Sequence, residues 1–141
     1  MQKLLTTSAV LLAALSFQPT AAETKAAEPK VEKTASGIVI TTLKSGTGAS
    51  PQSNETVKVH YRGVLADGKE FDSSYTRGQP ATFPLNRVIP CWTEGVQTMK
   101  VGGKAKLVCP PNLAYGSGGI PGTIPPNATL TFEVELLDIV R

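Results

Sequence analysis

The chain has 141 residues, 40% of them hydrophobic, a size that suits one globular domain with a single core. Its 14 basic and 11 acidic residues are scattered along the chain and give a formal net charge of +3. Since no dense basic stripe is present, we expect no nucleic-acid partner.

The first 22 residues have the pattern of an export signal. Lys3 provides the positive start, Leu4–Phe17 forms an apolar run, and small residues lead to Ala22. The alternative is a membrane anchor, but the run is interrupted by hydroxyl side chains and is shorter than the roughly 20 apolar residues that a span needs. We therefore expect cleavage after Ala22 and no stable membrane insertion.

Residues 23–36, ETKAAEPKVEKTAS, differ in composition from the rest of the chain. They are rich in Ala, Lys and Glu, contain Pro29, and have only Val31 as a sizeable apolar side chain. Such a composition is typical of a solvated segment that cannot build a core. We expect a flexible leader here and one folded domain over residues 37–141.

Short β-like runs separated by turn residues follow the leader. Within residues 55–65, Val57, Val59 and Tyr61 alternate with polar side chains, which is the pattern of a half-buried strand. Further extended runs are predicted at residues 37–44, 79–85, 104–110 and 128–140. Alternation within the last two predicts the inward side chains, which are Ala105, Leu107, Cys109, Leu130, Phe132, Val134 and Leu136.

One helix is predicted, over residues 90–99. Trp92, Val96 and Met99 fall at helical spacing, and Pro90 suits a first turn. The chain is therefore expected to be α+β, with a twisted antiparallel sheet folded around one short helix.

The sequence contains a single histidine, His60, and alternation places it on the polar side of its strand. This argues against a histidine-based metal cluster and against an acid–base triad. We expect no metal and no other cofactor.

Large apolar side chains gather at the ends of the predicted elements, and Asp72 directly follows one of them. A plain core explains some of these residues, but aromatic side chains in or beside loops also indicate an apolar pocket with a polar rim. The residues are Tyr61, Phe71, Phe83, Val88, Ile89, Trp92, Tyr115, Ile120, Ile124 and Phe132.

Three stretches resemble the FKBP-type peptidyl-prolyl cis-trans isomerases: VKVHYRGVLADGKEFDSS at 57–74, VIPCWTEGVQTMKVGGKAKLVCPPNLAYG at 88–116 and IPPNATLTFEVELLDI at 124–139. The chain is similar to the single-domain exported bacterial members, which implies a periplasmic location. The resemblance implies a twisted antiparallel sheet wrapped around one helix, with the substrate pocket between them.

The resemblance also implies roles for individual residues. Asp72 and Tyr115 would make the polar, catalytic contacts by orienting the substrate, and Trp92 would lie beneath the proline ring. The walls would be Tyr61, Phe71, Phe83 and Phe132, with Val88 and Ile89 beside the helix and Ile120 and Ile124 in a flap over residues 116–126.

The implied function is acceleration of X-Pro isomerisation during the folding of exported proteins, without covalent catalysis. Proline-containing polypeptides would be the clients, macrolide ligands of the family would bind the pocket, and the protein would be a monomer. A non-catalytic prolyl-peptide binding module or holdase that uses the same pocket stays open as an alternative.

Cys91 and Cys109 are the only cysteines. An even count in an exported protein favours a disulfide, and two buried thiols are the alternative. Cys91 stands where the family usually has glycine, directly before the tryptophan.

Overall fold

The structure, a computed structural model, describes residues 30–141. The predicted signal at 1–22 and residues 23–29 of the predicted leader lie outside the described residues. In the part that is described, no helix has the length and apolar character needed to cross a membrane.

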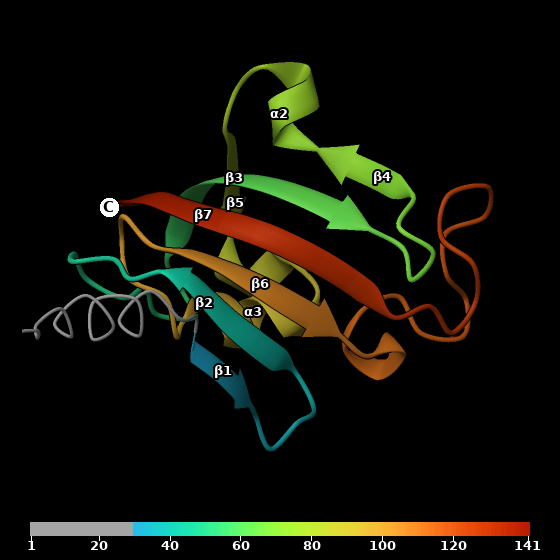
Figure 1. Cartoon of the computed structure of the whole chain (residues 1–141). Helices are drawn as coiled ribbons and strands as arrows, with labels where there is room; N and C mark the ends of the chain where they lie inside the picture. Colours follow the sequence, from blue (N-terminus) through green and yellow to red (C-terminus); the bar gives the residue numbers. More distant parts are fainter. Residues whose placement is uncertain (1–29) are drawn as a thin grey trace, which may run out of the picture.

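One antiparallel sheet of seven strands dominates the fold (Figure 1). The strand order is β1-β2-β6-β7-β3-β4, and β5 pairs with the first half of β3. The strands are β1 Lys30–Lys33, β2 Val39–Lys44, β3 Thr56–Val64, β4 Glu70–Ser73, β5 Ala81–Pro84, β6 Lys104–Cys109 and β7 Leu130–Val140.

Alternation of side chains decides which face of the sheet is buried. In β3, Val57 and Val59 are fully buried and Tyr61 is 5% exposed, whereas Lys58 between them is exposed. The same alternation in β6 and β7 confirms the inward positions predicted from the sequence, which are Ala105, Leu107, Cys109, Leu130, Phe132, Val134 and Leu136.

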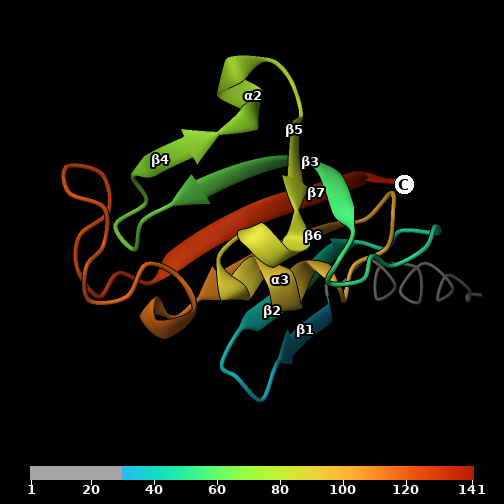
Figure 2. The ribbon, with the colours of Figure 1, turned by 180° about the vertical axis from the view of Figure 1, so that it is seen from behind.

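Helix α3, Pro90–Val96, packs on this buried face, as the view from behind shows (Figure 2). An α+β sheet with one main helix was predicted and is confirmed. The predicted end at Met99 was wrong: the helix stops at Val96, and the N–H groups of Thr98 and Met99 bond three residues back in a tight turn. Met99 is nevertheless buried, so the periodicity identified its burial but not its conformation.

Three short helical elements were not predicted. Helix α2 spans Ser74–Arg77. Ser73 caps its N-terminus with a side-chain oxygen that accepts from the Thr76 N–H, and Gly78, whose φ is 78°, caps its C-terminus. The two 3-10 turns are η1, Leu85–Arg87, and η2, Pro111–Leu113. None of them is long enough to produce a helical period in the sequence.

Strand β1 corrects the prediction of a flexible leader up to residue 36. It pairs antiparallel with β2, and a turn closed by the Gly37 N–H on the Thr34 carbonyl joins the two strands. All four residues of β1 are exposed. Because neither face is buried, the strand leaves no apolar alternation by which the sequence could reveal it.

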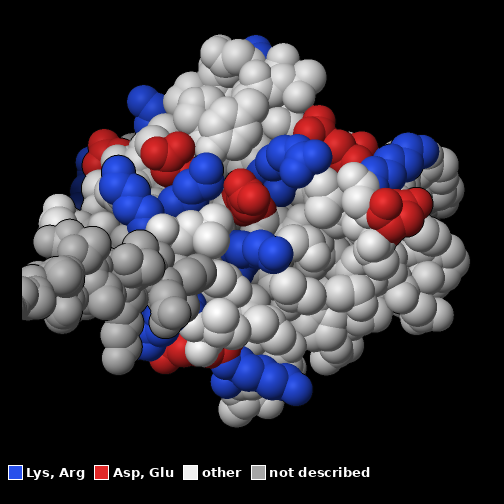
Figure 3. All heavy atoms as spheres, in the orientation of Figure 1, with Lys and Arg blue, Asp and Glu red and all other residues white. Residues whose placement is uncertain are grey.

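The outer face of the sheet carries charges of both signs. Lys104 approaches Glu133 at 3.7 Å across β6 and β7, and Arg62 meets Glu70 at 2.7 Å across β3 and β4. Figure 3 shows acidic and basic side chains interspersed over this side of the molecule. The sheet therefore has one polar face, and the opposite face carries the core and the site described next.

Candidate functional site

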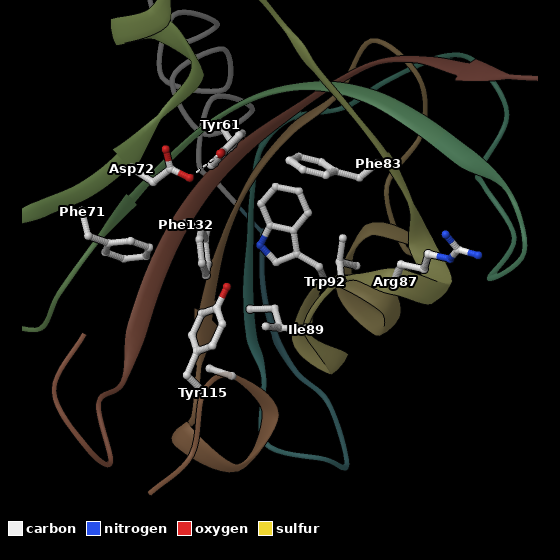
Figure 4. A pocket seen from close by; sticks show the side chains of 11 residues that line it. Tyr61, Phe71, Asp72, Phe83, Arg87, Ile89, Trp92, Tyr115 and Phe132 are labelled. Atoms are coloured by element: carbon white, nitrogen blue, oxygen red, sulfur yellow. Dashed lines mark hydrogen bonds between the residues drawn. The ribbon is translucent and has the colours of Figure 1, made fainter. Parts of the chain in front are cut away.

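A cavity of about 500 Å³ opens between the buried face of the sheet and the N-terminal end of α3 (Figure 4). This volume lies in the usual range for small-ligand sites, about 300–1,000 Å³. The lining residues are Tyr61, Phe71, Asp72, Phe83, Arg87, Val88, Ile89, Trp92, Ala114, Tyr115 and Phe132.

The lining comes from segments that are far apart in the sequence. Tyr61 and Phe132 lie on the paired strands β3 and β7, and both point toward the helix because inward positions alternate along each strand. Strand β4 adds Phe71 and Asp72, β5 adds Phe83, and the start of α3 adds Trp92. Antiparallel pairing on both sides of β3 thus brings four strands around one space, and α3 packs beside them.

Trp92 lies at the centre of the aromatic lining. Its ring contacts those of Tyr61, Phe83 and Phe132 edge-on, with centroid separations of 5.2, 5.6 and 5.4 Å. Perpendicular pairs of this kind each contribute about 0.5–1.5 kcal/mol beyond the area they bury. The neighbouring rings therefore hold the indole from three sides.

The indole Nε1 of Trp92 is the one buried side-chain nitrogen or oxygen in residues 30–141 that has no hydrogen-bond partner. Figure 4 shows it on the edge of the ring that faces Phe132. The perpendicular contact directs this positive edge toward the electron-rich face of the phenyl ring, which partly compensates the lost hydrogen bond.

A polar network forms one end of the pocket. The Tyr61 hydroxyl donates to Asp72 Oδ2 at 2.5 Å, and Arg77 donates to Asp72 Oδ1 at 2.6 Å and to the Tyr61 oxygen at 3.0 Å. The Ser73 N–H also donates to Asp72 Oδ1, at 2.9 Å. Both carboxylate oxygens are therefore engaged, and Asp72 is held as an anion beside the aromatic wall.

The pKa shifts agree with this arrangement. Burial by itself would raise the pKa of Asp72, but hydrogen bonds from Tyr61 and Arg77 outweigh it and hold that pKa below its usual value. Burial, together with the bond to Asp72, raises the pKa of Tyr61. At neutral pH the network therefore contains a carboxylate and a protonated phenol, and neither group changes its protonation state near that pH.

Tyr115 is the polar group that the network leaves free. It follows η2, and its hydroxyl points into the cavity toward Phe132 (Figure 4). Burial, followed by the charge of Asp72, raises its pKa, so the hydroxyl stays a donor. No side chain or backbone group among residues 30–141 accepts from it, and the residue is 40% exposed. The Tyr115 hydroxyl can therefore donate to a bound molecule.

Nine of the eleven residues predicted for the site line the cavity, but Ile120 and Ile124 do not. Each of these two isoleucines donates its N–H to the carbonyl of the other at 2.8 Å, which closes a small loop. This pairing turns Ile124 inward to 3% exposure and leaves Ile120 36% exposed at the loop tip. The prediction that both cover the pocket is not met by this structure.

Arg87 and Ala114 line the cavity, although neither was predicted for the site. Ala114 directly precedes Tyr115, so its place follows from that of its neighbour. Arg87 ends η1, and a charged residue in a short turn gives no periodic signal. Only its nearness to Val88 and Ile89 in the sequence could have suggested it.

The disulfide between Cys91 and Cys109 connects the helix to the sheet beneath the site. Both residues are fully buried, and they join the first turn of α3 to the end of β6. Because Cys91 directly precedes Trp92, the bridge fixes the segment that presents the indole. In the described range, no group of three or more His, Cys, Asp or Glu side chains is arranged to hold a metal ion.

Comparisons with known proteins agree in one family. Residues 48–137 match the family model described as FKBP-type peptidyl-prolyl cis-trans isomerase. The chain is 55% identical over 114 residues to the FKBP-type peptidyl-prolyl cis-trans isomerase FkpA of Escherichia coli K12, covering 81% of this chain and 42% of that protein. FkpA of Aeromonas hydrophila is 58% identical over 111 residues, covering 79% and 41%. The chain thus spans less than half the length of these curated relatives.

A solved structure of similar size also matches. The peptidyl-prolyl cis-trans isomerase of Pseudomonas syringae pv. tomato DC3000 superposes with a TM-score of 0.75 at 41% identity, covering 89% of this chain and 99% of that one. The likeness therefore extends over a whole compact protein as well as over part of a longer one.

Proposed function

Since this chain belongs to the FKBP-type peptidyl-prolyl cis-trans isomerases, we propose that its pocket accelerates the cis–trans isomerisation of X-Pro bonds in polypeptides. The observation that carries the proposal is the combination of an aromatic pocket with a free hydroxyl donor, that of Tyr115, aimed into it.

The physical task is to lower a rotational barrier. The cis and trans forms of an X-Pro bond differ by only about 0.5–1 kcal/mol, but the barrier is about 18–20 kcal/mol, and uncatalysed interconversion takes tens to hundreds of seconds. No covalent bond needs to break. A site accelerates the reaction if it binds the twisted amide, in which resonance is lost, better than it binds either planar form.

The apolar lining suits such differential binding. Water stabilises the dipolar planar amide more than the twisted one, so a site that excludes water removes part of the advantage of the planar forms. The proline ring would rest on Trp92, with Tyr61, Phe83 and Phe132 around it, and Phe71 would extend the wall. Val88 and Ile89 would contact the chain on the helix side.

The polar residues would orient the substrate. The Tyr115 hydroxyl would donate to a substrate carbonyl, which fixes one side of the rotating bond. The N–H of Ile89, which has no backbone acceptor in the described part of the chain, would provide a second donor. Asp72 would act through Tyr61 and Arg77, and would also favour a substrate N–H or C–H edge over a carbonyl oxygen at its end of the pocket.

The clients would be exported proteins, and the location would be the periplasm, supported by the signal pattern of residues 1–22. Macrolide ligands of the family would compete for the pocket, and the domain would act as a monomer. A chaperone effect on unfolded clients would accompany the isomerase activity.

The test is the refolding of a protein whose slow phase is limited by a prolyl bond. We expect the protein to raise the rate constant of the slow phase and to leave its amplitude unchanged. Glu133→Ala, on the opposite face of β7 from Phe132, is a control variant that should accelerate the slow phase as the wild type does. A holdase would change the refolding yield without changing the rate constant of the slow phase. That outcome would contradict the proposed enzyme and favour a non-catalytic prolyl-peptide binding module.

A further inference from the structure

Arg87 differs from the other arginines of the chain. All four arginines lie in the described residues, and three of them are paired: Arg62 with Glu70 at 2.7 Å, Arg77 with Asp72 at 2.6 Å and Arg141 with Glu55 at 2.6 Å. Arg87 has neither an ion pair nor a side-chain hydrogen bond within residues 30–141, and it is exposed. Within the described residues, the arginine that lines the pocket is thus the one without a carboxylate partner.

The surrounding chain offers Arg87 no acid. Residues 73–93, which include α2, β5 and η1, contain no Asp or Glu. The first acid after this stretch is Glu94 on α3, and both of its carboxylate oxygens accept from the Ser36 hydroxyl, at 2.6 and 2.7 Å. Glu55, whose carbonyl accepts from the Leu85 N–H in η1, is paired with Arg141. No carboxylate in residues 30–141 is therefore paired with Arg87, and a carboxylate of a bound molecule can take that place.

The two ends of the pocket differ in charge. Figure 4 shows Arg87 on one side of Trp92, with its guanidinium directed outward from the aromatic centre, and Asp72 on the other. At the Asp72 end, the carboxylate is compensated by Arg77. At the Arg87 end, no acidic side chain of residues 30–141 compensates the guanidinium. A peptide whose proline occupies the aromatic centre would extend past this charge on one side.

From this asymmetry we propose that Arg87 is a specificity-determining residue, which selects substrates with an acidic side chain next to the proline. The inference rests on the proposed function, because it assumes that prolyl peptides occupy the pocket. A guanidinium suits the task because its planar donors match a carboxylate in a bidentate geometry. A lysine at the same substrate position would be disfavoured by like charge.

The expected preference is modest because the site is exposed. Solvent-exposed arginine–carboxylate pairs correspond to factors of about two to five in an equilibrium or rate ratio. Salt should reduce the preference, since the Debye length falls from about 30 Å at 0.01 M to about 10 Å at 0.1 M ionic strength. Selectivity of this size biases the choice among clients without excluding any.

The experiment compares short prolyl peptides that differ at one position. Glu, Gln and Lys are placed directly before the proline in one series and directly after it in a second. The Glu-to-Gln ratio of kcat/KM is measured at low and high salt for the wild type, Arg87→Gln and Lys106→Gln. Lys106 is exposed on the outer side of β6, so its replacement gives the same change in net charge away from the pocket.

We expect a Glu-to-Gln ratio of about two to five in one of the two series at low salt. The ratio should fall to about one in Arg87→Gln and at high salt, and it should stay at the wild-type value in Lys106→Gln. A ratio of one in both series for the wild type would overturn the inference, as would a preference that survives in Arg87→Gln.

A binding measurement separates this inference from the proposed function. Trp92 is the only tryptophan in the chain, so its fluorescence reports occupancy of the pocket. If no peptide is isomerised but the Glu peptide binds more tightly in an Arg87-dependent manner, the enzyme proposal fails and the selectivity stands. If the peptides are isomerised but bind and react without regard to charge, the selectivity fails and the enzyme proposal stands.

Discussion

At the scale of single residues, Asp72 is held too firmly to act as a proton donor or acceptor. Its two oxygens accept from Tyr61, Arg77 and the Ser73 N–H, and its pKa is lowered. We therefore propose that Asp72 orients Tyr61 and shapes the electric field in the pocket. This role is smaller than that of an acid–base catalyst, whose removal abolishes the chemistry.

We predict that Asp72→Ala lowers kcat/KM for a prolyl peptide by roughly tenfold to a hundredfold at most, which corresponds to about 1.4–2.7 kcal/mol of transition-state stabilisation. The loss comes from freeing Tyr61 and Arg77 to adopt other orientations. Peptide kinetics with a folded variant measure it. Asp138→Ala, on an exposed position of β7, is the matched control that should behave as wild type. A complete loss with the fold intact would contradict the orienting role.

The pKa shifts predict a flat pH dependence. The lowered pKa of Asp72 keeps it ionised at every pH above its ordinary value of 3.8, so its contribution is lost only as the pH falls through the lower folded value. The raised pKa values of Tyr61 and Tyr115 keep both protonated up to at least their ordinary value of 10.0. His60, the one histidine, lies on the other side of β3 and bonds to Ser74.

We therefore expect kcat/KM for a neutral prolyl peptide to vary by less than about twofold between pH 5 and 9. Measuring kcat/KM against pH in buffers of constant ionic strength tests this. A bell-shaped profile with a limb near pH 6 to 8 would mean that a titrating group takes part in the reaction, which the network described above does not provide.

At the scale of elements, the loop between η2 and β7 depends on one glycine. Gly119 has a φ of +58°, and a Cβ on it would come within 2.3 Å of the Ile124 carbonyl oxygen. Its N–H also bonds to the Tyr115 carbonyl at 3.1 Å. The backbone of the loop and the position of the free tyrosine are therefore coupled through this residue.

Gly119→Ala should displace the loop and lower kcat/KM by about two- to tenfold, the value of one hydrogen bond from Tyr115. Gly118→Ala is the matched control, because a Cβ there meets nothing within 4 Å and its φ lies outside the left-handed region. Equal activity of the two variants would show that the loop conformation does not position Tyr115.

The disulfide links α3 to β6 across 18 positions. By loop entropy, replacing both Cys91 and Cys109 with alanine should lower the free energy of unfolding by about 3 kcal/mol. Urea unfolding of the oxidised wild type and of the double variant measures the difference. Reducing the wild type under the same conditions is the control and should give a similar loss. An unchanged midpoint would mean that packing alone fixes the helix.

Elements were predictable from the sequence where one face is buried against the core. The alternation in β3, β6 and β7 and the period of α3 identified the inward side chains. Strand β1 and helix α2 were not predicted, because they are held by backbone pairing and by caps, which leave no apolar pattern in the sequence. The turn at Thr98 and Met99 was not predicted, because the side chain of Met99 is buried although it lies past the end of the helix.

At the scale of the whole molecule, the sheet order creates the site. Strand β3 pairs with β7 on one side and with β4 and β5 on the other, which brings Tyr61, Phe132, Phe71 and Phe83 to one end of α3. These residues were predictable as a group through the family resemblance and from their aromatic character. Ile124, predicted in the flap, is buried and does not line the cavity, and its backbone pairs with Ile120, a local pairing that composition does not reveal.

The central claim is that this pocket catalyses X-Pro isomerisation. The most direct test is the cis-to-trans relaxation rate of a short X-Pro peptide in large molar excess over the protein. The wild type is compared with a Tyr115→Ala/Phe132→Ala double variant that circular dichroism shows to be folded. We predict clear acceleration by the wild type, over several residues before the proline, and its loss in the double variant. A folded wild type that leaves every peptide at its uncatalysed rate would contradict the account.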